Sequence, residues 1–215
     1  MKTVVLLSGG LDSAVLLARV LDAGVAAVAV SVDYGQRHAR ELRAAAAVAA
    51  HYGVPRDVVA LPPALMSGSA LTGSGPVPHG HYADESMRST VVPARNLVLL
   101  SLAAAVAVRE GAAAVAYAAH AGDHAVYPDC RPGFVEAARQ VLARCDYRPV
   151  SLITPFVGWA KADVVAEGHR LGVPFAETWS CYEGGKWHCG ACGTCVERAE
   201  AFATARVPDP TRYAG

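Results

Sequence analysis

The sequence predicts an α/β protein in which helices cover both faces of a doubly wound, mostly parallel sheet. Short apolar runs rich in valine alternate with alanine-rich segments of helical spacing, which is the pattern of consecutive strand–helix units. Glycines follow several of the helical segments, where a residue that tolerates a left-handed conformation ends a helix. From Trp179 onward the composition changes to cysteine and glycine. We therefore expect a main domain over residues 1–177 and a small module over residues 178–215 that packs on it.

Strands and helices alternate regularly at the start of the chain. The apolar runs are short and rich in β-branched residues, as expected for parallel strands that are buried on both faces. Gly24 and Gly53 end the two helical segments. We predict strands at 2–7, 25–32 and 57–61, and helices at 15–21 and 41–52.

The alternation stops at residues 62–94 and then resumes. This segment is rich in Gly, Pro, Ser and His and is longer than ordinary connections in compact domains, so we expect either a functional loop or a disordered stretch. Polar residues gather at 120–131, directly after a predicted strand. The elements predicted after the interruption are a helix at 96–110, a strand at 112–119, and helices at 134–145 and 161–171.

Charge and apolar runs limit the possible functions. Nineteen basic residues balance nineteen acidic ones, whereas proteins that grip nucleic acid carry a basic surplus that neutralises phosphates. The balance favours a small-molecule substrate and no nucleic-acid partner. The longest apolar run, near 97–108, falls short of the roughly 20 residues of a membrane span, and the N-terminus lacks a signal-peptide core. We expect a cytoplasmic protein without membrane contact, whose cysteines are reduced or bind metal.

A glycine-rich hinge, Ser8-Gly9-Gly10-Leu11-Asp12-Ser13, joins the first predicted strand to the first helix. In an open parallel sheet, ligands bind beyond the carboxyl ends of the strands. The glycines allow a tight turn with inward-facing N–H groups, and the helix N-terminus adds positive potential, so the hinge is a predicted anion site. The hinge is neither a kinase-type phosphate loop nor a dinucleotide fingerprint. The alternative is an ordinary turn that is capped by Asp12.

The C-terminal module holds four cysteines with the spacing C-x7-C-x2-C-x2-C. Four convergent thiolates without an open coordination position suit a structural Zn²⁺ ion. An iron–sulfur cluster is the alternative, because C-x2-C-x2-C also begins a ferredoxin-type run. We expect His188 to be a neighbour rather than a ligand, and Cys130 and Cys145 to lie outside the site. The predicted metal ligands are Cys181, Cys189, Cys192 and Cys195.

The S-G-G-x-D-S stretch after a first strand resembles the pyrophosphate loop of the ATP pyrophosphatases, which have the adenine-nucleotide alpha-hydrolase (PP-loop) fold. The resemblance implies that residues 7–13 bind ATP and that the leaving pyrophosphate is held by Ser8, Gly9, Gly10 and Ser13. Asp12 would then help to place Mg²⁺. The implied ATP-binding residues are Leu7, Ser8, Gly9, Gly10, Leu11, Asp12 and Ser13.

Four further stretches narrow the resemblance: DYGQRHARE at 33–41, VPARNLVLLSLA at 92–103, YPDCRPGF at 127–134 and TWSCYEGG at 178–185. With the loop and the cysteines, they resemble the 7-cyano-7-deazaguanine synthase (QueC) family over residues 4–206. The family activity implied is an ATP-dependent ligation of 7-carboxy-7-deazaguanine and ammonia, which yields the nitrile, AMP and pyrophosphate in queuosine biosynthesis. The carboxylate is adenylated and converted to an amide, and the amide oxygen is then adenylated before AMP leaves.

The resemblance also implies roles for individual residues. Arg37 is expected to bind phosphate or the substrate carboxylate, although an ion pair with Glu41 is equally compatible with its position. Cys130 is expected to pack rather than to act as a nucleophile, because adenylation removes the need for one. The implied catalytic residues are Asp12, Ser13, Arg95 and Lys161, the last with a solvated lysine as the alternative. The implied substrate-binding residues are Tyr34, Gln36, Arg37, Asn96, His120, Asp123, Asp129 and Arg131.

The chain departs from the family pattern at two positions. Ala94 stands where the pattern has glycine, and Gly133 stands where it has glutamate, which removes a charge.

Residues 69–72 also resemble the family, and we expect the segment 62–94 to close over the bound base as a lid. A homodimer is expected.

Other functions remain compatible with parts of the pattern. A tRNA-modifying PP-loop enzyme with an iron–sulfur cluster shares the loop and three of the cysteines, but the balanced charge disfavours it. A zinc-knuckle binding protein with a decayed nucleotide fold is disfavoured by the intact S-G-G-x-D-S stretch. A relative that stops at the amide, or that serves another deazapurine pathway, is not separated from the family activity by these motifs.

Overall fold

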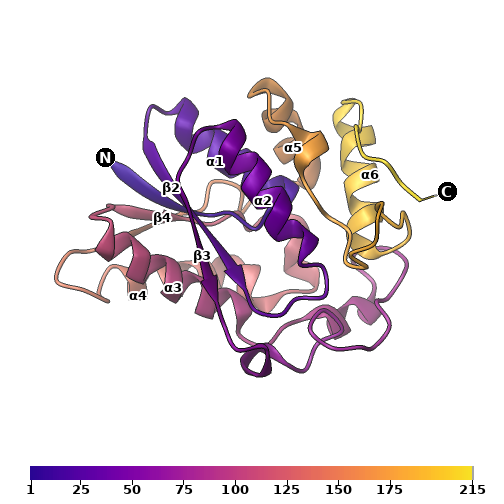
Figure 1. Cartoon of the computed structure of the whole chain (residues 1–215), viewed down its shortest axis with the longest axis horizontal. Coiled ribbons are helices and arrows are strands. Elements are labelled where there is room, and N and C mark those ends of the chain that lie inside the picture. The colour runs from indigo at the N-terminus through magenta and orange to yellow at the C-terminus, as the bar shows by residue number, and fades with distance from the viewer. Residues whose placement is uncertain (215) are drawn as a thin grey trace.

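The computed structural model describes residues 1–214 and contains one five-stranded sheet in which all strands are parallel (Figure 1). The strand order is β3-β2-β1-β4-β5. The chain passes from β1 through β2 to β3 at one edge of the sheet, then crosses back over β1 to β4 and continues to β5 at the other edge. This is the doubly wound order predicted from the sequence. The strands are β1 (Lys2–Leu6), β2 (Ala26–Asp33), β3 (Arg56–Ala60), β4 (Ala114–Ala116) and β5 (Ser151–Ile153).

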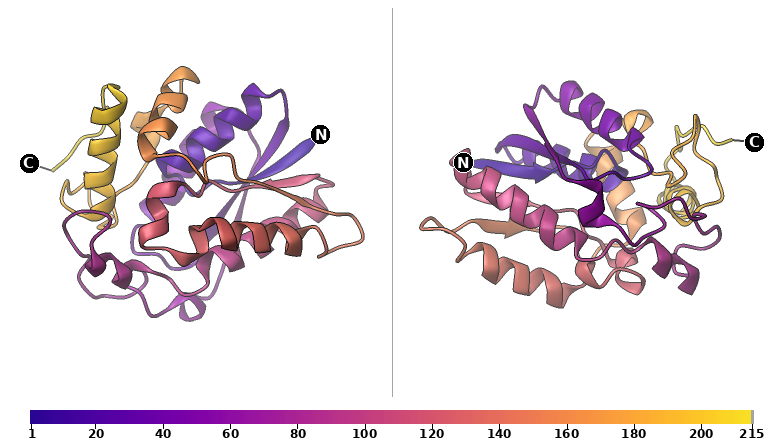
Figure 2. Two further views of the ribbon diagram at one scale, coloured as in Figure 1. Left: turned by 180° about the vertical axis from the view of Figure 1, so that it is seen from behind. Right: turned by 60° about the horizontal axis from the view of Figure 1, so that its bottom comes forward.

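Helices cover both faces of the sheet (Figures 1 and 2). One face is covered by α1, α2 and α5, with α6 beside α5, and the other by α3 and α4. Within the described residues, none of these helices is both long and apolar enough to traverse a membrane. The helices are α1 (Leu11–Asp22), α2 (Arg40–His51), α3 (Arg95–Arg109), α4 (Pro132–Leu142), α5 (Lys161–Arg170) and α6 (Gly193–Ala205).

The central strand β1 explains why the sheet has two cores. Val4 and Leu6 belong to the cluster with α3 and α4, whereas Val5 and Leu7 belong to the cluster with α1, α2 and α5. Val4 and Val5 are both fully buried. Successive side chains of a strand point to opposite faces, so an unbroken apolar run fills both layers at once.

Most predicted elements are present within a few residues of their expected bounds. The predicted strand at 112–119 is shorter, because pairing along β4 ends at Ala116. The helix predicted at 134–145 starts two residues earlier, at Pro132, where a proline is favourable because the first helical N–H has no partner in the helix. The first helix begins at Leu11, directly after the glycines.

Two elements were not predicted. The edge strand β5 exposes Ser151 and Ile153 and buries only Leu152, which is too short a pattern to recognise. Helix α6 lies in the cysteine-rich module, where glycine and cysteine obscured its helical spacing. Its buried residues Ala201 and Phe202 join the core beneath α5.

The segment 62–94 is packed rather than disordered. It contains short 3₁₀ helices at Pro63–Met66 and Glu85–Thr90. Leu71 and Met87 are fully buried in the core that includes α3. The N–H of Gly80 donates to the carbonyl of Ala191 in the cysteine module (3.0 Å). Figure 1 shows the segment running from the end of β3 to the underside of α6.

Candidate active site

A cleft opens beyond the carboxyl ends of β1, β2 and β4, the position where open parallel sheets bind ligands. The structure brings together here most of the residues singled out from the sequence. Those that line the cleft are Leu7, Ser8, Gly10, Leu11, Asp12, Ser13, Tyr34, Arg95, Asn96, Asp123 and Lys161.

The glycine-rich hinge turns tightly between β1 and α1. Gly9 has a φ of +94°, and a Cβ atom there would lie 2.1 Å from the carbonyl oxygen of Glu41, so only glycine fits. The Oγ atoms of Ser8 and Ser13 lie 3.2 Å apart. Within the described chain, Asp12 Oδ1 has no hydrogen-bond partner and Asp12 Oδ2 accepts from Lys161, so Asp12 does not cap α1 as the alternative proposed. The helix N-terminus instead faces the cleft with its first N–H groups available to an anion.

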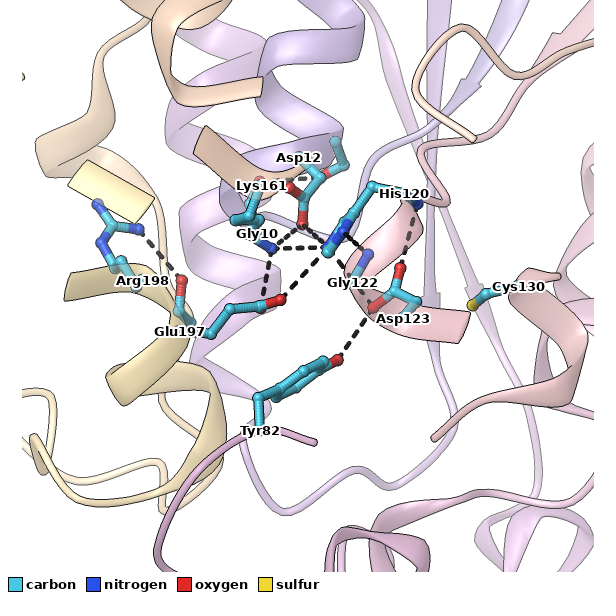
Figure 3. A network of polar contacts seen from close by, with 12 residues as sticks. Gly10, Asp12, Tyr82, His120, Gly122, Asp123, Cys130, Lys161, Glu197 and Arg198 are labelled. Carbon is cyan, nitrogen blue, oxygen red and sulfur yellow. Dashed lines mark hydrogen bonds and ion pairs between the residues drawn. The ribbon is translucent and has the colours of Figure 1, made fainter. Parts of the chain in front are cut away.

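Lys161 lies on the hinge side of the cleft, among Asp12, His120 and Glu197 (Figure 3). Its Nζ lies 2.6 Å from Asp12 Oδ2, 3.4 Å from Glu197 Oε2 and 3.1 Å from His120 Nε2. Burial alone would lower the pKa of Lys161, but the attraction of Asp12 and Glu197 outweighs it and raises the pKa above its usual range. Lys161 is therefore a charged amine held in place by carboxylates from two other helices, not a solvated lysine.

His120 lies behind Lys161 and is 1% exposed. Its Nδ1 accepts from the N–H of Gly122 (3.1 Å), and its Nε2 lies 3.5 Å from Asp123 Oδ1. The hydroxyl of Tyr82 donates to the same Asp123 oxygen (3.0 Å; Figure 3). Tyr82 belongs to the segment 62–94, so that segment contributes directly to the wall of the cleft.

The other side of the cleft is aromatic and contains one guanidinium. Tyr34, Tyr117, Tyr127 and Tyr182 line it around Arg95, whose Cζ lies 6.0 Å from the Tyr127 ring centre. Within the described residues, no carboxylate lies within ion-pair distance of Arg95. An apolar, aromatic surface beside an unpaired cation suits a planar ligand that carries an anion.

The residue directly before Arg95 has a strained backbone. Ala94 precedes α3 in the left-handed region, with a φ of 53°, a conformation that glycine adopts without strain. The resemblance to the family predicted glycine at this position. The side chain of Asn96 then points toward Cys130 (Nδ2 to Sγ, 3.4 Å).

Several residues implied by the resemblance do not line the cleft. Gln36 is buried and bonds to the N–H of Tyr34 and to Glu41. Asp129 accepts from the N–H of Asn96 (3.1 Å) at the start of α3.

Two arginines also lie away from the cleft. Arg37 pairs with Glu183 (3.3 Å), not with Glu41 as the alternative interpretation proposed. Arg131 is exposed and donates to the carbonyl of His124.

Sequence reasoning missed several residues that line the cleft. Glu197 comes from the unpredicted helix α6, and Tyr82 from a segment without periodicity. His38 and Glu41 follow β2 at the sheet edge, as did the residues that were named, and this position was the available signal. Tyr182 was visible only as part of a family motif.

The four predicted cysteines converge on one point. Their Sγ atoms all lie within 4.8 Å of one another, and the Sγ atoms of Cys189 and Cys195 are 3.9 Å apart. In a tetrahedral centre with bonds of about 2.3 Å, the sulfurs are separated by about 3.8 Å. The N–H of Cys192 donates to Cys189 Sγ, which favours a thiolate. These residues fit a bound metal ion.

The other candidate thiols and the candidate histidine lie outside the group of four converging cysteines. His188 Nε2 accepts from the N–H of Ser180 (3.1 Å), so this nitrogen is occupied. Burial raises the pKa of the Cys130 thiol, which contacts the hydroxyl of Tyr117, so the thiol is protonated, as expected of a packed residue. Cys145 is exposed, away from the cysteine centre.

Comparisons with known proteins show the family of this chain. The family model described as "Queuosine biosynthesis protein QueC" matches residues 2–206. The 7-cyano-7-deazaguanine synthase of Paracoccus denitrificans is 54% identical over 99% of this chain and 93% of its own length. That of Ruegeria pomeroyi is 52% identical over the whole of this chain and 95% of its own length.

Solved structures confirm the fold. An NMN synthetase from Francisella tularensis aligns with a TM-score of 0.51 at 14% identity, over 96% of this chain and 77% of that one. A predicted subunit of a tRNA methyltransferase from Methanocaldococcus jannaschii aligns with a TM-score of 0.50 at 17% identity, over 80% and 74% of the two chains. At these identities the likeness concerns architecture alone. The near-complete family match and the identities above 50% show that the chain belongs to the QueC family of 7-cyano-7-deazaguanine synthases.

Proposed function

We propose that this protein is an ATP-dependent carbon–nitrogen ligase that converts 7-carboxy-7-deazaguanine and ammonia into 7-cyano-7-deazaguanine, with AMP and pyrophosphate as by-products. One observation carries the proposal. In a chain of this family, a single cleft joins an uncapped helix N-terminus and Lys161 to an aromatic wall with the unpaired Arg95. The first half suits a leaving pyrophosphate, and the second suits a planar acid.

On the phosphate side, the hinge and Lys161 bind the negative charge that develops as pyrophosphate leaves. Donors fixed before the reaction stabilise such charge without reorganisation. Ser13 sits in the first turn of α1, where its hydroxyl donates to the carbonyl of Gly10 (3.0 Å), and we propose that it turns to the phosphates when ATP binds. No covalent nucleophile is needed, because positioning of the two reactants supplies much of the rate.

We propose that Asp12 also helps to hold Mg²⁺. Its Oδ1 is buried and, within the described chain, has no hydrogen-bond partner, while its Oδ2 contacts Lys161. Asp123 and Glu197 add two carboxylates nearby, so the phosphate side carries more negative than positive side chains. A divalent ion would offset this excess and shield the charge of ATP.

On the aromatic side, the deazaguanine ring would lie among the tyrosines with its carboxylate directed toward Arg95. A guanidinium matches the planar geometry of a carboxylate and can bond it through two N–H groups. Asn96 lies beside Arg95 and lines the same wall. We assign Asp123 and His120 a supporting role, because they bond to Tyr82 and Gly122.

The cysteine centre is proposed to hold structural zinc, with an iron–sulfur cluster as the outcome that metal analysis would distinguish. Four thiolates leave no open position for a substrate. Residues 178–215 would form a module that packs on the main domain through α6 and α5, and the protein is proposed to be a cytoplasmic homodimer.

Incubation with 7-carboxy-7-deazaguanine, ammonium, Mg²⁺ and ATP, followed by mass spectrometry, tests the proposal. The expected products are the nitrile, AMP and pyrophosphate. Amide without nitrile would assign the chain to an amide-forming relative. Production of ADP, or no conversion of the acid, would refute the proposed reaction.

A further inference from the structure

His38 is a buried residue of the cleft wall, and one of its two ring nitrogens has no partner in the described chain. It lies between β2 and α2, is 4% exposed, and belongs to the cleft wall. Within the described residues, its Nδ1 is buried and has no hydrogen-bond partner. Buried polar groups without a protein partner are rare, and a bound ligand is a frequent explanation.

The other ring nitrogen of His38 faces a fixed carboxylate. His38 Nε2 lies 3.5 Å from Glu41 Oε2, and Glu41 Oε1 accepts a hydrogen bond from Gln36 (3.0 Å). The backbone of Glu41 rests against Gly9 of the hinge. The His38 ring also packs at a tilt on Tyr182, with 5.4 Å between ring centres. The imidazole is therefore held between the hinge side and the aromatic side of the cleft.

This arrangement selects one tautomer. An ionised carboxylate only accepts hydrogen bonds, so the ring proton sits on Nε2 and Nδ1 presents a lone pair. Burial is the main cause that lowers the pKa of His38; Arg95 lowers it further, while Glu41 and Cys192 oppose the shift. The ring is neutral at pH 7, and its free atom is an acceptor for an N–H group.

The nitrile-forming step requires such an acceptor. An amide nitrogen carries two N–H protons, and a nitrile nitrogen carries none. The carboxylates on the phosphate side, Asp12 and Glu197, already face Lys161. His38 stands apart from them, and no group with an assigned role in phosphate binding contacts its free nitrogen.

We propose that His38 Nδ1 removes the last N–H proton when the adenylated amide becomes the nitrile, and that Glu41 is its positioning residue. The inference rests on the proposed function. In this step the N–H bond of the neutral imidate breaks and its proton passes to Nδ1. The electron pair of that bond forms the new carbon–nitrogen π bond, and the bond from carbon to the AMP oxygen breaks with its pair going to AMP.

The experiment compares two half-reactions in the same proteins. Wild type, His38→Gln and Glu41→Gln are supplied with ATP, Mg²⁺ and either the acid with excess ammonium or the isolated amide. Amide and nitrile are measured by mass spectrometry. His51→Gln is the control, since His51 is an exposed histidine at the far end of α2.

Loss of a general base lowers its step by about 10²–10⁴-fold. For His38→Gln we expect a decrease of this size in nitrile formation from the amide, with amide formation from the acid reduced far less. Excess ammonia can take the proton released in the first step. Amide should therefore accumulate. Glu41→Gln should raise the ratio of amide to nitrile by about tenfold. His51→Gln should give the same ratio as wild type.

An unchanged amide-to-nitrile ratio in both variants would overturn the inference, even if total turnover fell. A higher KM for the acid with an unchanged ratio would make His38 a ligand of the base instead and would also overturn it. If His38→Gln does not fold, the ratio in Glu41→Gln decides. A wild-type protein that makes neither product refutes the proposed function itself, which is a separate result.

Discussion

The amine of Lys161 and the carboxylate of Asp12 meet at 2.6 Å although 149 positions separate them in the chain. Asp12 is in the first turn of α1 and Lys161 is the first residue of α5. Packing of these two helices on one face of the sheet brings both residues to the carboxyl ends of the strands. The contact fixes a positive charge beside the helix N-terminus that follows the hinge.

Replacement of Lys161 by methionine should lower AMP formation by about 10²–10³-fold, the usual cost of removing one charge-stabilising donor. Methionine retains most of the side-chain volume but leaves Asp12 and Glu197 facing each other without a cation. The rate of AMP release at saturating ATP is the measurement. Lys186→Met is the control, because Lys186 is an exposed lysine outside the cleft, and equal losses in both variants would contradict the role of Lys161.

Replacement of Ala94 by glycine should raise the free energy of unfolding by about 1 kcal/mol, because glycine adopts the left-handed conformation without a Cβ penalty. The same substitution at Ala105, an exposed residue inside α3, should lower it by about 1 kcal/mol. Denaturant titration of both variants measures the difference. Equal signs for the two substitutions would show that residue 94 is not strained.

Removal of the metal should destabilise both the module and the segment 62–94. The Sγ atoms would lose their shared ion, and structural zinc contributes on the order of 10 kcal/mol of apparent folding energy at neutral pH. Cys192→Ser should behave like chelator treatment, whereas Cys145→Ser should leave the unfolding curve unchanged, since Cys145 is exposed. Metal content by mass spectrometry identifies the ion. A Cys192→Ser protein of wild-type stability would exclude a structural centre.

Binding of substrates should protect the segment 62–94 from trypsin. Arg88 is strongly exposed in the short helix Glu85–Thr90 and offers a cleavage site there. A lid that closes over the base would slow cleavage at Arg88 when ATP and the acid are present. Cleavage at Arg144, at the end of α4, should continue at the same rate. Identical digestion with and without ligands would count against a lid.

Asp209 should stabilise the protein only above acid pH. Burial alone would raise the pKa of Asp209, but hydrogen bonds from Thr211 and Tyr213 and the charge of Arg198 lower it below the ordinary value of 3.8. Because the folded pKa is the lower one, the contribution is present above 3.8 and disappears as the pH falls through the folded value.

The Asp209→Asn variant tests this pH dependence. Its unfolding free energy should be lower than that of wild type by about 1–3 kcal/mol near pH 6, as for a partly buried hydrogen bond to a charged group. The difference should shrink below pH 4. A difference that grows on acidification would have the wrong sign.

The sequence predicted the sheet and the hinge because both depend on local patterns. The apolar run of β1 and the glycines at positions 9 and 10 indicate their structures from a few neighbouring residues alone. Glu197 was missed for the opposite reason. It becomes part of the cleft only because α6 packs beside α5, and no local signal encodes that packing.

Residues taken from family motifs fall into two groups, according to whether their side chains point into the cleft or away from it. Tyr34 and Arg95 line the cleft, whereas Arg37, three residues after Tyr34, pairs with Glu183 outside it. Motif membership places a residue at the correct sheet edge but does not determine its direction. The tertiary contacts of the module and of the segment 62–94 decide the direction.

Gly9 has a mechanical consequence for the whole cleft. The carbonyl of Glu41 would lie 2.1 Å from any Cβ at position 9, so the hinge and the first turn of α2 touch backbone to backbone. No side chain acts as a compliant spacer between them. A shift of the hinge on nucleotide binding would therefore displace the first turn of α2 as well, next to the turn that carries His38.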